Sequence, residues 1–334
     1  MNVNVSKIAL FCIQPLIFVV AVISVAFNIV RRFFKGGQFT EQVSGEGLVA
    51  VVTGANTGIG LETVRGLSAA RVKVYMLCRD TQKGVEARTK LAQMGCDSTK
   101  LVLLRCDLAD FSTVRECAES ILRDEEKIDI LVNNAGIMFY PKYERTVDGH
   151  EVTWQSNHLG HVLLTELLLP ALKRASSARI IFVSSRLHHL CRSLDLATVD
   201  DKEAFGLLSP YTHSKLAKVM YARELSKRLH KQGIHNVFVN SLHPGVVDSS
   251  LCRHTILAKT PFQELIAPIR WLCMKSDRDG AQTSLYLALS KNVDGISGKY
   301  FMDCKIAREN PLALNDRACE EVYDYSLQQC GIAA

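Results

Sequence analysis

The sequence lacks the features that mark several classes of protein. Lysine and arginine form no block in the body of the 334-residue chain, and the net charge is only +6, so nucleic-acid binding is disfavoured. With 8 prolines, 20 glycines and 48% hydrophobic residues, the chain is not of the disordered, collagenous or coiled-coil type. We find no internal repeat, low-complexity tract or second domain boundary. We therefore expect one folded domain, while the sequence leaves open whether it forms a homo-oligomer.

CxxC pairs and metal-finger spacings are also missing. The eleven cysteines are an odd number, spread from Cys12 to Cys330, which favours free thiols in a reducing compartment; a partly disulfide-bonded secreted protein is the alternative. His188, His189 and Cys191 lie close together, but no fourth ligand follows at a recognised spacing, so we expect no metal site. Ser184 and Ser185 precede these histidines, but no GxSxG motif surrounds either serine, which disfavours a serine hydrolase.

One long hydrophobic run stands out at the amino terminus. Ile8–Val30 contains 23 residues without a charge, which as a helix would span roughly 34 Å, more than the ~30 Å of a hydrocarbon core. We interpret it as a membrane anchor; a cleaved signal peptide, with Ser24–Ala26 near its cleavage site, is the alternative. Because Arg31, Arg32 and Lys35 follow the run, the positive-inside rule places the rest of the chain in the cytosol.

The chain is expected to have three parts. Residues 1–35 form the anchor region, residues 36–47 a polar linker with glycines, and residues 48–334 the folded domain. In this last part apolar runs alternate with helical stretches, which predicts a doubly wound parallel sheet of the Rossmann type, because such strands are buried on both faces. The expected strands are Leu48–Val52, Val72–Leu77, Leu101–Leu104, Ile128–Val132, Ile180–Val183, Val237–Val239 and Tyr300–Met302.

A glycine-rich turn follows the first expected strand directly. Thr53–Gly60 opens into a helix expected over Leu61–Ala70. Gly54 allows a tight turn, Gly58 a close backbone approach to a pyrophosphate, and Gly60 close packing of helix and strand. The helix amino terminus then faces the phosphates with unpaired N–H groups and the positive end of its dipole. The placement between strand and helix predicts a dinucleotide cofactor.

The end of the second strand predicts which dinucleotide. An NAD-binding fold usually carries an acidic residue there, but this chain has the neutral Cys78 followed by Arg79. A guanidinium can bind a ribose 2′-phosphate, and no carboxylate at Cys78 repels it. Asp80 is expected to cap the next helix. We therefore expect NADPH.

Tyr211 and Lys215 form a further candidate pair. They are four residues apart and share one face of a helix that begins near Pro210. Reduction of a carbonyl leaves negative charge on its oxygen, so a proton donor must lie beside it, and a nearby ammonium favours an ionised tyrosine. This spacing arises easily by chance, and its meaning depends on the motifs around it.

Five motifs together resemble the short-chain dehydrogenase/reductase family. The glycine turn has the spacing GxxxGxG, and it is followed in the family's order by Asn133–Gly136, Ser185, Tyr211–Lys215 and Pro244–Gly245. The resemblance covers about residues 48–304 and implies that the folded domain is a catalytic domain binding a nicotinamide dinucleotide. Each motif is weak alone, whereas five in register are specific.

The resemblance implies which residues contact the cofactor. Asp107–Leu108 is similar to an adenine-binding turn, and Val247 to a backbone contact of the nicotinamide carboxamide. Asn133, Ala135 and Gly136 are similar to the floor beside the adenosine ribose. The full implied set is Gly54, Asn56, Gly58, Ile59, Gly60, Arg79, Asp107, Leu108, Asn133, Ala135, Gly136, Tyr211, Lys215, Pro244, Gly245 and Val247.

The resemblance also implies four catalytic roles. Tyr211 is the acid/base, Lys215 binds the nicotinamide ribose and lowers the pKa of the tyrosine, and Ser185 donates a hydrogen bond to the substrate oxygen. Asn157 holds a water in a proton relay to the lysine. The separation of Ser185 and Tyr211, 26 residues, is longer than in many family members, and we expect Arg186–Ser209 to form a loop that shapes the substrate site.

Further segments resemble the membrane-anchored retinol dehydrogenase branch, namely Leu77–Asp80, Asn157–His161, His243–Gly245 and Ser297–Cys304. Trp154–Ser156 and Phe139–Tyr140 depart from its pattern. The branch implies NADPH, an amino-terminal anchor and reduction of retinaldehyde or related lipid aldehydes. The apolar segment Leu251–Leu272 favours a lipophilic substrate if it covers the site or touches the membrane, although an ordinary packed helix has the same pattern.

The sequence thus predicts an NADPH-dependent oxidoreductase of the endoplasmic reticulum membrane, its catalytic domain facing the cytosol, that interconverts retinol and retinaldehyde or a similar lipophilic pair. Reduction of another lipid carbonyl, such as a sterol, a polyprenal or a lipid-peroxidation aldehyde, is the alternative. A cofactor-binding scaffold without turnover is disfavoured, because Asn157, Ser185, Tyr211 and Lys215 are all present.

Overall fold

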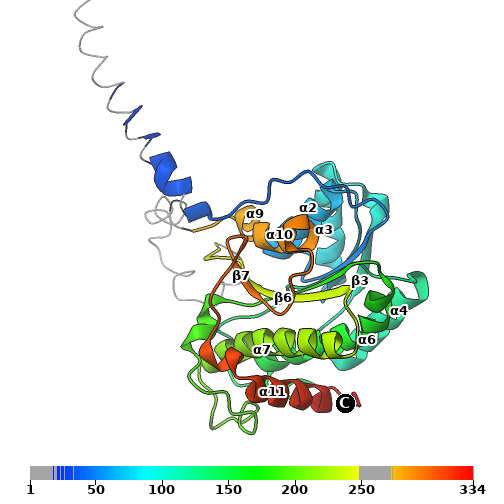
Figure 1. Cartoon of the computed structure of the whole chain (residues 1–334), viewed down its shortest axis with the longest axis vertical. Coiled ribbons are helices and arrows are strands. Elements are labelled where there is room, and N and C mark those ends of the chain that lie inside the picture. The colour runs from blue at the N-terminus through cyan, green and yellow to red at the C-terminus, as the bar shows by residue number, and fades with distance from the viewer. Residues whose placement is uncertain are drawn as a thin grey trace, which may run out of the picture.

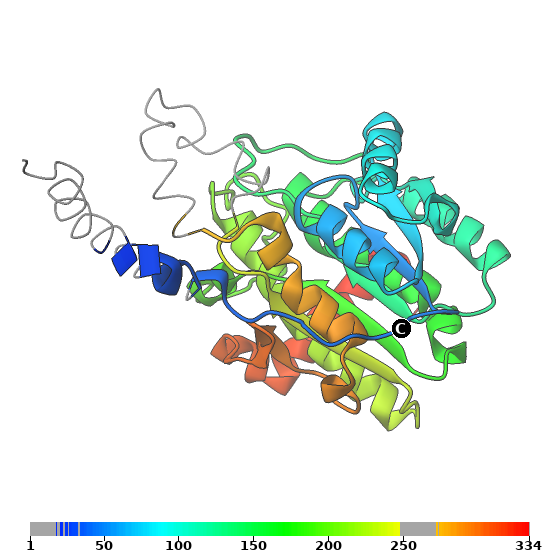
Figure 2. The same ribbon diagram turned by 90° about the horizontal axis from the view of Figure 1, so that it is seen from above.

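A sheet of eight strands separates two layers of helices in the computed structural model (Figure 1). The described residues are 18, 21–22, 24–25, 27–32, 34–247, 272 and 274–333. Figure 2 shows the same arrangement from above, with the blue amino-terminal helical residues projecting away from the body. The predicted segment Leu251–Leu272 lies outside the described residues except for Leu272.

The sheet has the order β3-β2-β1-β4-β5-β6-β7-β8, with β1 to β7 parallel and β8 antiparallel to β7. This confirms the predicted parallel Rossmann-type sheet, whereas the short β8 was not predicted. The strands are β1 (Val49–Thr53), β2 (Lys73–Cys78), β3 (Leu101–Arg105), β4 (Ile130–Asn133), β5 (Ala178–Val183), β6 (Val237–His243), β7 (Tyr300–Met302) and β8 (Lys305–Ile306).

Helices cover both faces of the sheet. On one face lie α2 (Gly58–Ala69), α3 (Thr81–Gln93), α9 (Asp277–Gly280) and α10 (Gln282–Leu289). The other face carries α4 (Phe111–Asp124), α6 (Gly160–Arg174), α7 (Ser209–Lys231) and α11 (Asp316–Gln329). The shorter elements are α5 (Val152–Trp154), η1 (Ser98–Lys100), the π-helical η2 (Gln155–Leu159), η3 (Arg186–Leu190), η6 (Lys291–Val293) and η7 (Pro311–Leu314).

Two hydrophobic cores explain why the strand sequences are apolar throughout. Successive side chains of a strand point to opposite faces, so both faces need apolar residues. In β1, Val49 and Val51 belong to the core shared with α4, α6, α7 and α11. Ala50 and Val52 belong to the core shared with α2, α3 and α10. The strand order reverses between β1 and β4, and such a switch point opens a crevice at the carboxyl ends of the strands.

Residues 36–47, the predicted linker, run along α9 and α10 (Figures 1 and 2). Gln38 Nε2 lies 3.3 Å from Asp279 Oδ1, and the Phe39 amide donates to Gln282 Oε1 at 3.0 Å. Arg31 forms a buried ion pair with Asp279. Most of the predicted anchor, residues 8–30, lies outside the described residues. Within the part of the chain that is described, no helix combines the length and apolar character needed to cross a membrane.

Candidate active site

A cavity of about 920 Å³ opens at the carboxyl ends of the central strands. It brings together residues that the sequence spreads from Thr53 to Val247. Of the predicted site residues, only Asn133 and Asn157 are missing from its wall. Those that line it are Gly54, Asn56, Gly58, Ile59, Gly60, Arg79, Asp107, Leu108, Ala135, Gly136, Ser185, Tyr211, Lys215, Pro244, Gly245 and Val247.

The glycine turn connects β1 to α2 along one side of the cavity. Gly54 and Gly58 have φ values of +64° and +59°, in the left-handed region that favours glycine. A Cβ atom on Gly60 would lie 2.2 Å from the Gly54 carbonyl oxygen, so only glycine lets the helix approach the strand this closely. The Thr57 side chain makes no capping hydrogen bond, which leaves the first N–H groups of α2 for a ligand in the cavity.

Hydrogen bonds join the ends of β1 and β4 beneath the cavity. Thr53 Oγ1 accepts from the amides of Asn134 (2.9 Å) and Ala135 (3.0 Å), and Asn134 Nδ2 donates to the Thr53 carbonyl at 2.8 Å. Asn133 is fully buried beside the cavity and donates to Thr165 Oγ1 at 2.9 Å. Asn134, which the sequence analysis did not assign, lines the wall instead. Because successive side chains along an extended chain point in opposite directions, Asn133 and Asn134 cannot both face the cavity, and this alternation could have distinguished them.

The end of β2 carries an exposed cation beside a buried thiol. Arg79 is exposed and lines the cavity, while Cys78 is buried and its pKa is raised to about 12 by burial. Asp80 caps α3 as expected, accepting from the Lys83 amide at 3.1 Å, and this bond lowers the pKa of its carboxyl. Lys83 also lines the cavity, although the sequence analysis did not single it out.

Tyr211 and Lys215 lie in the first turns of α7, which begins at Ser209 with a proline in its first turn. The Lys215 Nζ lies 5.5 Å from the centre of the Tyr211 ring and donates to the Val183 carbonyl at 3.0 Å. Ser184 Oγ donates to the Lys215 carbonyl at 2.6 Å, so two bonds fix the helix to the end of β5. Burial lowers the pKa of Lys215 to about 8. Among the described residues, no carboxylate forms an ion pair with this ammonium.

Ser185 follows β5 and lies on the wall of the same cavity. Its hydroxyl accepts a hydrogen bond from the Leu187 amide at 3.2 Å, which caps η3. Because the oxygen accepts this bond, the hydroxyl hydrogen is left to donate to a second oxygen. Ser185, after β5, and Tyr211 and Lys215, on α7, therefore line one cavity.

Asn157 lies behind the cavity in the π-helical segment η2. Its Oδ1 accepts from the Ile137 amide at 2.8 Å, and its Nδ2 lies 3.0 Å from the Ile137 carbonyl and 3.1 Å from Ser214 Oγ. A Cβ on Gly136 would lie 3.0 Å from Asn157 Oδ1 and 3.4 Å from Lys215 Nζ. The bare glycine thus separates the asparagine from the lysine. Single-turn π segments are frequent at functional sites.

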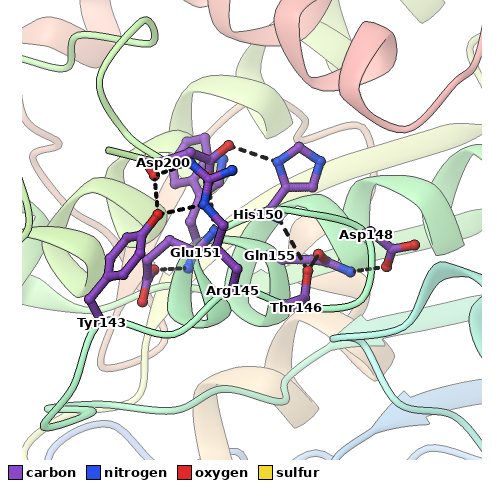
Figure 3. A network of polar contacts seen from close by, with 9 residues as sticks. Tyr143, Arg145, Thr146, Asp148, His150, Glu151, Gln155 and Asp200 are labelled. Carbon is purple, nitrogen blue, oxygen red and sulfur yellow. Dashed lines mark hydrogen bonds and ion pairs between the residues drawn. The ribbon is translucent and has the colours of Figure 1, made fainter. Parts of the chain in front are cut away.

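A network of polar contacts orients the segment before η2 (Figure 3). Gln155, the first residue of η2, donates to Asp148 at 2.6 Å and bonds Thr146. The Asp200 carboxylate, from the loop after η3, accepts from His150 Nδ1 at 2.7 Å and from the Glu151 amide at 2.7 Å. The network therefore fastens the chain before Asn157 to the loop that the sequence predicted as a substrate-site element.

Several apolar side chains also line the cavity. The predicted loop Arg186–Ser209 begins with η3, from which Leu187, His189 and Leu190 line the cavity. Met138 and Val246, which the sequence analysis did not assign, line the same cavity. Among the described residues, no group of histidine, cysteine and acidic side chains is arranged to hold a metal ion.

Known proteins resemble this chain in sequence and in structure. A family model described as short chain dehydrogenase matches residues 48–259. The chain is 40% identical to retinol dehydrogenase 12 of Homo sapiens over 303 residues, which cover 91% of this chain and 92% of that protein.

Solved structures share the fold. An uncharacterized protein from Mycobacterium paratuberculosis has a TM-score of 0.70 at 29% identity, covering 88% of this chain and 98% of its own. A Pseudomonas aeruginosa RhlG/NADP active-site complex has a TM-score of 0.61 at 26% identity, covering 79% and 97%. The family match spans well over half of the chain and agrees with its five motifs. The chain therefore belongs to the short chain dehydrogenase family and is an NAD(P)-dependent oxidoreductase.

Proposed function

We propose that the enzyme uses NADP(H) to interconvert a lipophilic alcohol and its aldehyde or ketone, with retinol and retinaldehyde as the first candidate pair. The observation that carries the proposal is the convergence of Tyr211, Lys215 and Ser185 on the cavity that the glycine turn enters. The similarity to retinol dehydrogenase 12 supports the substrate class.

The residues present fit NADP(H). The uncapped start of α2 and the close approach of Gly60 to Gly54 form a cradle for phosphates that a side chain would fill. Arg79 and Lys83 would hold a ribose 2′-phosphate, and the neutral Cys78 does not repel it. The similar RhlG structure is a complex with NADP, which supports the same preference.

Bound NADPH would supply the hydride that reduces the substrate carbonyl. Tyr211 donates a proton to the carbonyl oxygen as negative charge develops there, and the Ser185 hydroxyl donates a hydrogen bond to the same oxygen. The Lys215 ammonium, beside the Tyr211 ring, stabilises the tyrosinate that remains. Asn157, bonded to Ile137 and Ser214, holds the backbone around the lysine, and a water in relay with it remains part of the proposal.

The cavity wall supports an apolar substrate. Leu187, Leu190 and Met138 supply apolar surface to the cavity, which suits a hydrocarbon chain better than a sugar or an amino acid. The same apolar lining would also accept another lipid aldehyde or ketone, which is therefore the second candidate substrate.

The proposal includes membrane attachment through residues 8–30, with residues 36–47 as the connection to a catalytic domain of residues 48–334 in the cytosol. The apolar run and the cations that follow it support this arrangement at the endoplasmic reticulum. Protease added to sealed microsomes should digest the body while the apolar segment stays protected. If the folded domain is protected from protease in intact vesicles, it lies in the lumen and the proposed orientation is wrong.

Turnover by membranes containing the full chain tests the activity. Retinaldehyde, a sterol ketone, a polyprenal and an aliphatic aldehyde should be compared, each with NADPH and with NADH. Retinaldehyde with NADPH should give the highest kcat/KM. Preference for another lipid would move the assignment to the second candidate, and NADPH binding without turnover of any of them would indicate a scaffold.

Tyr211→Phe tests the acid/base role. The variant keeps the ring and lacks the proton donor, so reduction should fall about 10²-fold or more while NADPH binding persists. Tyr325→Phe on α11, outside the cavity wall, is the matched control and should keep full turnover. Near-normal turnover by Tyr211→Phe would refute the role.

A further inference from the structure

His188 is a buried histidine that contacts the backbone of Ser185. It is the third residue of η3, fully buried, and it does not line the cavity. Its Nδ1 lies 2.6 Å from the Ser185 carbonyl oxygen, and the Asn310 amide donates to its Nε2 at 3.1 Å. The ring therefore connects a candidate catalytic residue to a segment 122 residues further along the chain.

These two partners determine the tautomer of His188. A backbone N–H can only donate, so Nε2 must carry the lone pair that accepts from Asn310. A carbonyl can only accept, so Nδ1 must carry the hydrogen that Ser185 receives. Burial lowers the pKa of His188 to about 4, which keeps the ring neutral at physiological pH. Both ring nitrogens are occupied, which excludes His188 as a general base for the reaction.

Asn310 holds the remainder of η3 from the same side. Its Nδ2 lies 2.8 Å from the carbonyl oxygens of His188 and of Cys191, and its Oδ1 accepts from the Leu312 amide at 2.9 Å. The His188 ring also packs edge-on against Tyr300 of β7, with centroids 4.8 Å apart. The middle and the carboxyl end of η3 are thus bound to Asn310, the residue that caps η7.

The Ser185 carbonyl receives two donors, the His188 amide at 3.0 Å and the His188 Nδ1 at 2.6 Å. Two bonds in different directions fix the plane of the peptide after Ser185, and with it the direction in which the serine side chain leaves the backbone. Leu187 and Leu190 on η3 line the cavity, so the same bonds also place its apolar wall. A displacement of about 1 Å in such a group can cost 10²-fold in rate.

We propose that His188 and Asn310 are positioning residues, which hold the Ser185 hydroxyl in the geometry that reduction requires. The inference rests on the proposed role of Ser185. It makes the segment after β8 part of the active-site support, although that segment does not line the cavity.

A double-mutant cycle with Ser185→Ala tests the inference in the full-length enzyme. His188→Phe keeps a ring and lacks both nitrogens, and kcat should fall about 10- to 100-fold in the Ser185 enzyme. In the Ser185→Ala enzyme the same change should lower kcat less than about threefold, because the group that it positions is gone. His188→Asn retains a donor near Nδ1 and should recover part of the loss. His230→Phe, an exposed histidine on α7, is the control and should change neither background.

Thermal midpoint and NADPH affinity should be measured for every variant, since a merely structural defect moves both. If His188→Phe does not fold, Asn310→Ala replaces it, because it leaves the ring in place and must show the same loss of kcat and the same dependence on Ser185. Equal losses of kcat in both backgrounds, or full kcat in a folded His188→Phe enzyme, would overturn the inference. Full activity of Ser185→Ala alone would instead overturn the proposed role of Ser185.

Discussion

The part of the molecule before β4 and the part from β4 to β7 satisfy their polar groups differently. Before β4, α3 and α4 are capped by the residues next to them in sequence, Asp80 and Asp110. From β4 onward, buried bases reach distant partners: His161 Nε2 lies 2.8 Å from Thr53 Oγ1, and His158 Nε2 lies 2.7 Å from Ser326 Oγ. All ten histidines lie between residues 150 and 254.

The two halves of the proposed site, the cofactor side and the catalytic side, are therefore held together by different kinds of contact. The proposed cofactor side consists of backbone positions that are close in sequence, so single glycines and the charged side chains of Arg79 and Lys83 should determine its affinity. The catalytic side depends on long-range contacts of neutral buried bases, so protonation and remote substitutions should disturb it. A change made on one side should therefore leave the properties of the other side nearly unchanged.

Lowering the pH should produce the largest loss of stability, and this loss should be concentrated on the catalytic side. Burial lowers the pKa values of His158 and His243 to about 3 and of His188 to about 4, and that of His161 falls well below its usual value. In the unfolded chain a histidine binds a proton below about pH 6.5. In the folded protein these buried histidines stay neutral until the pH reaches their lowered pKa values. The free energy of unfolding should therefore fall as pH drops from 7 to 5, by about 1 to 2 kcal/mol for each buried histidine.

Hydrogen exchange resolved by peptide at pH 7 and pH 5, corrected for the intrinsic rates, locates this loss. Peptides of α6, η3 and β6 should lose protection before those of β1 and β2. Equal loss on both sides would remove the basis of the comparison.

Gly60→Ala should break the cofactor side. The added Cβ would meet the Gly54 carbonyl oxygen at 2.2 Å, and displacing that backbone should cost about 3 kcal/mol or more, roughly a hundredfold in NADPH affinity. Gly95→Ala is the control, because its Cβ enters open space and only the strain of φ +88° remains, about 1 kcal/mol of stability. Fluorescence titration with NADPH gives the affinities. Unchanged affinity in Gly60→Ala would show that the turn does not hold the phosphates.

Arg79→Ala should alter the choice of cofactor. Charge-assisted contacts to a phosphate are worth about 1.5–3 kcal/mol, so the KM for NADPH should rise roughly 10- to 150-fold while that for NADH stays unchanged. Adding Cys78→Asp should shift preference further towards NADH, because a carboxylate repels the 2′-phosphate. Lys90→Ala removes an equal charge from the exposed side of α3 as the control. A folded Arg79→Ala enzyme that discriminates as before would place the phosphate elsewhere.

Asp200→Ala should have the smallest effect, on the catalytic side. It leaves the His150 ring and the Glu151 amide without their carboxylate partner (Figure 3), at a cost of about 1 kcal/mol, or a thermal midpoint lower by roughly 2–4 °C. Turnover should fall only about two- to threefold, with NADPH affinity unchanged. Asp201→Ala, the exposed neighbour, is the control. A lowered NADPH affinity in Asp200→Ala would contradict the separation of the two sides.

What the sequence could predict depends on whether a feature is made by residues close together in the chain. The GxxxGxG turn and the pair Tyr211 and Lys215 are local patterns, so their placement on one cavity could be expected from spacing and strand order. The contact between His188 and Asn310 joins residues 122 positions apart and leaves no periodic signal. The hairpin to β8 was missed because Asp303 and Cys304 take positive φ values of 53° and 59° without the glycine that such turns usually contain.

The buried ion pair of Arg31 with Asp279 sets the shortest chain that can be prepared without the apolar run. Arg31 Nη1 also donates to the Met274 carbonyl at 2.8 Å, and both partners of the pair are less than a tenth exposed. A chain cut at Leu48 would lose both Arg31 and Gln38, two of the partners of the Asp279 carboxylate. A chain that starts at Val30 retains the pair. Preparation of a soluble catalytic body therefore has to begin upstream of the sheet, inside the segment that the sequence assigned to the anchor.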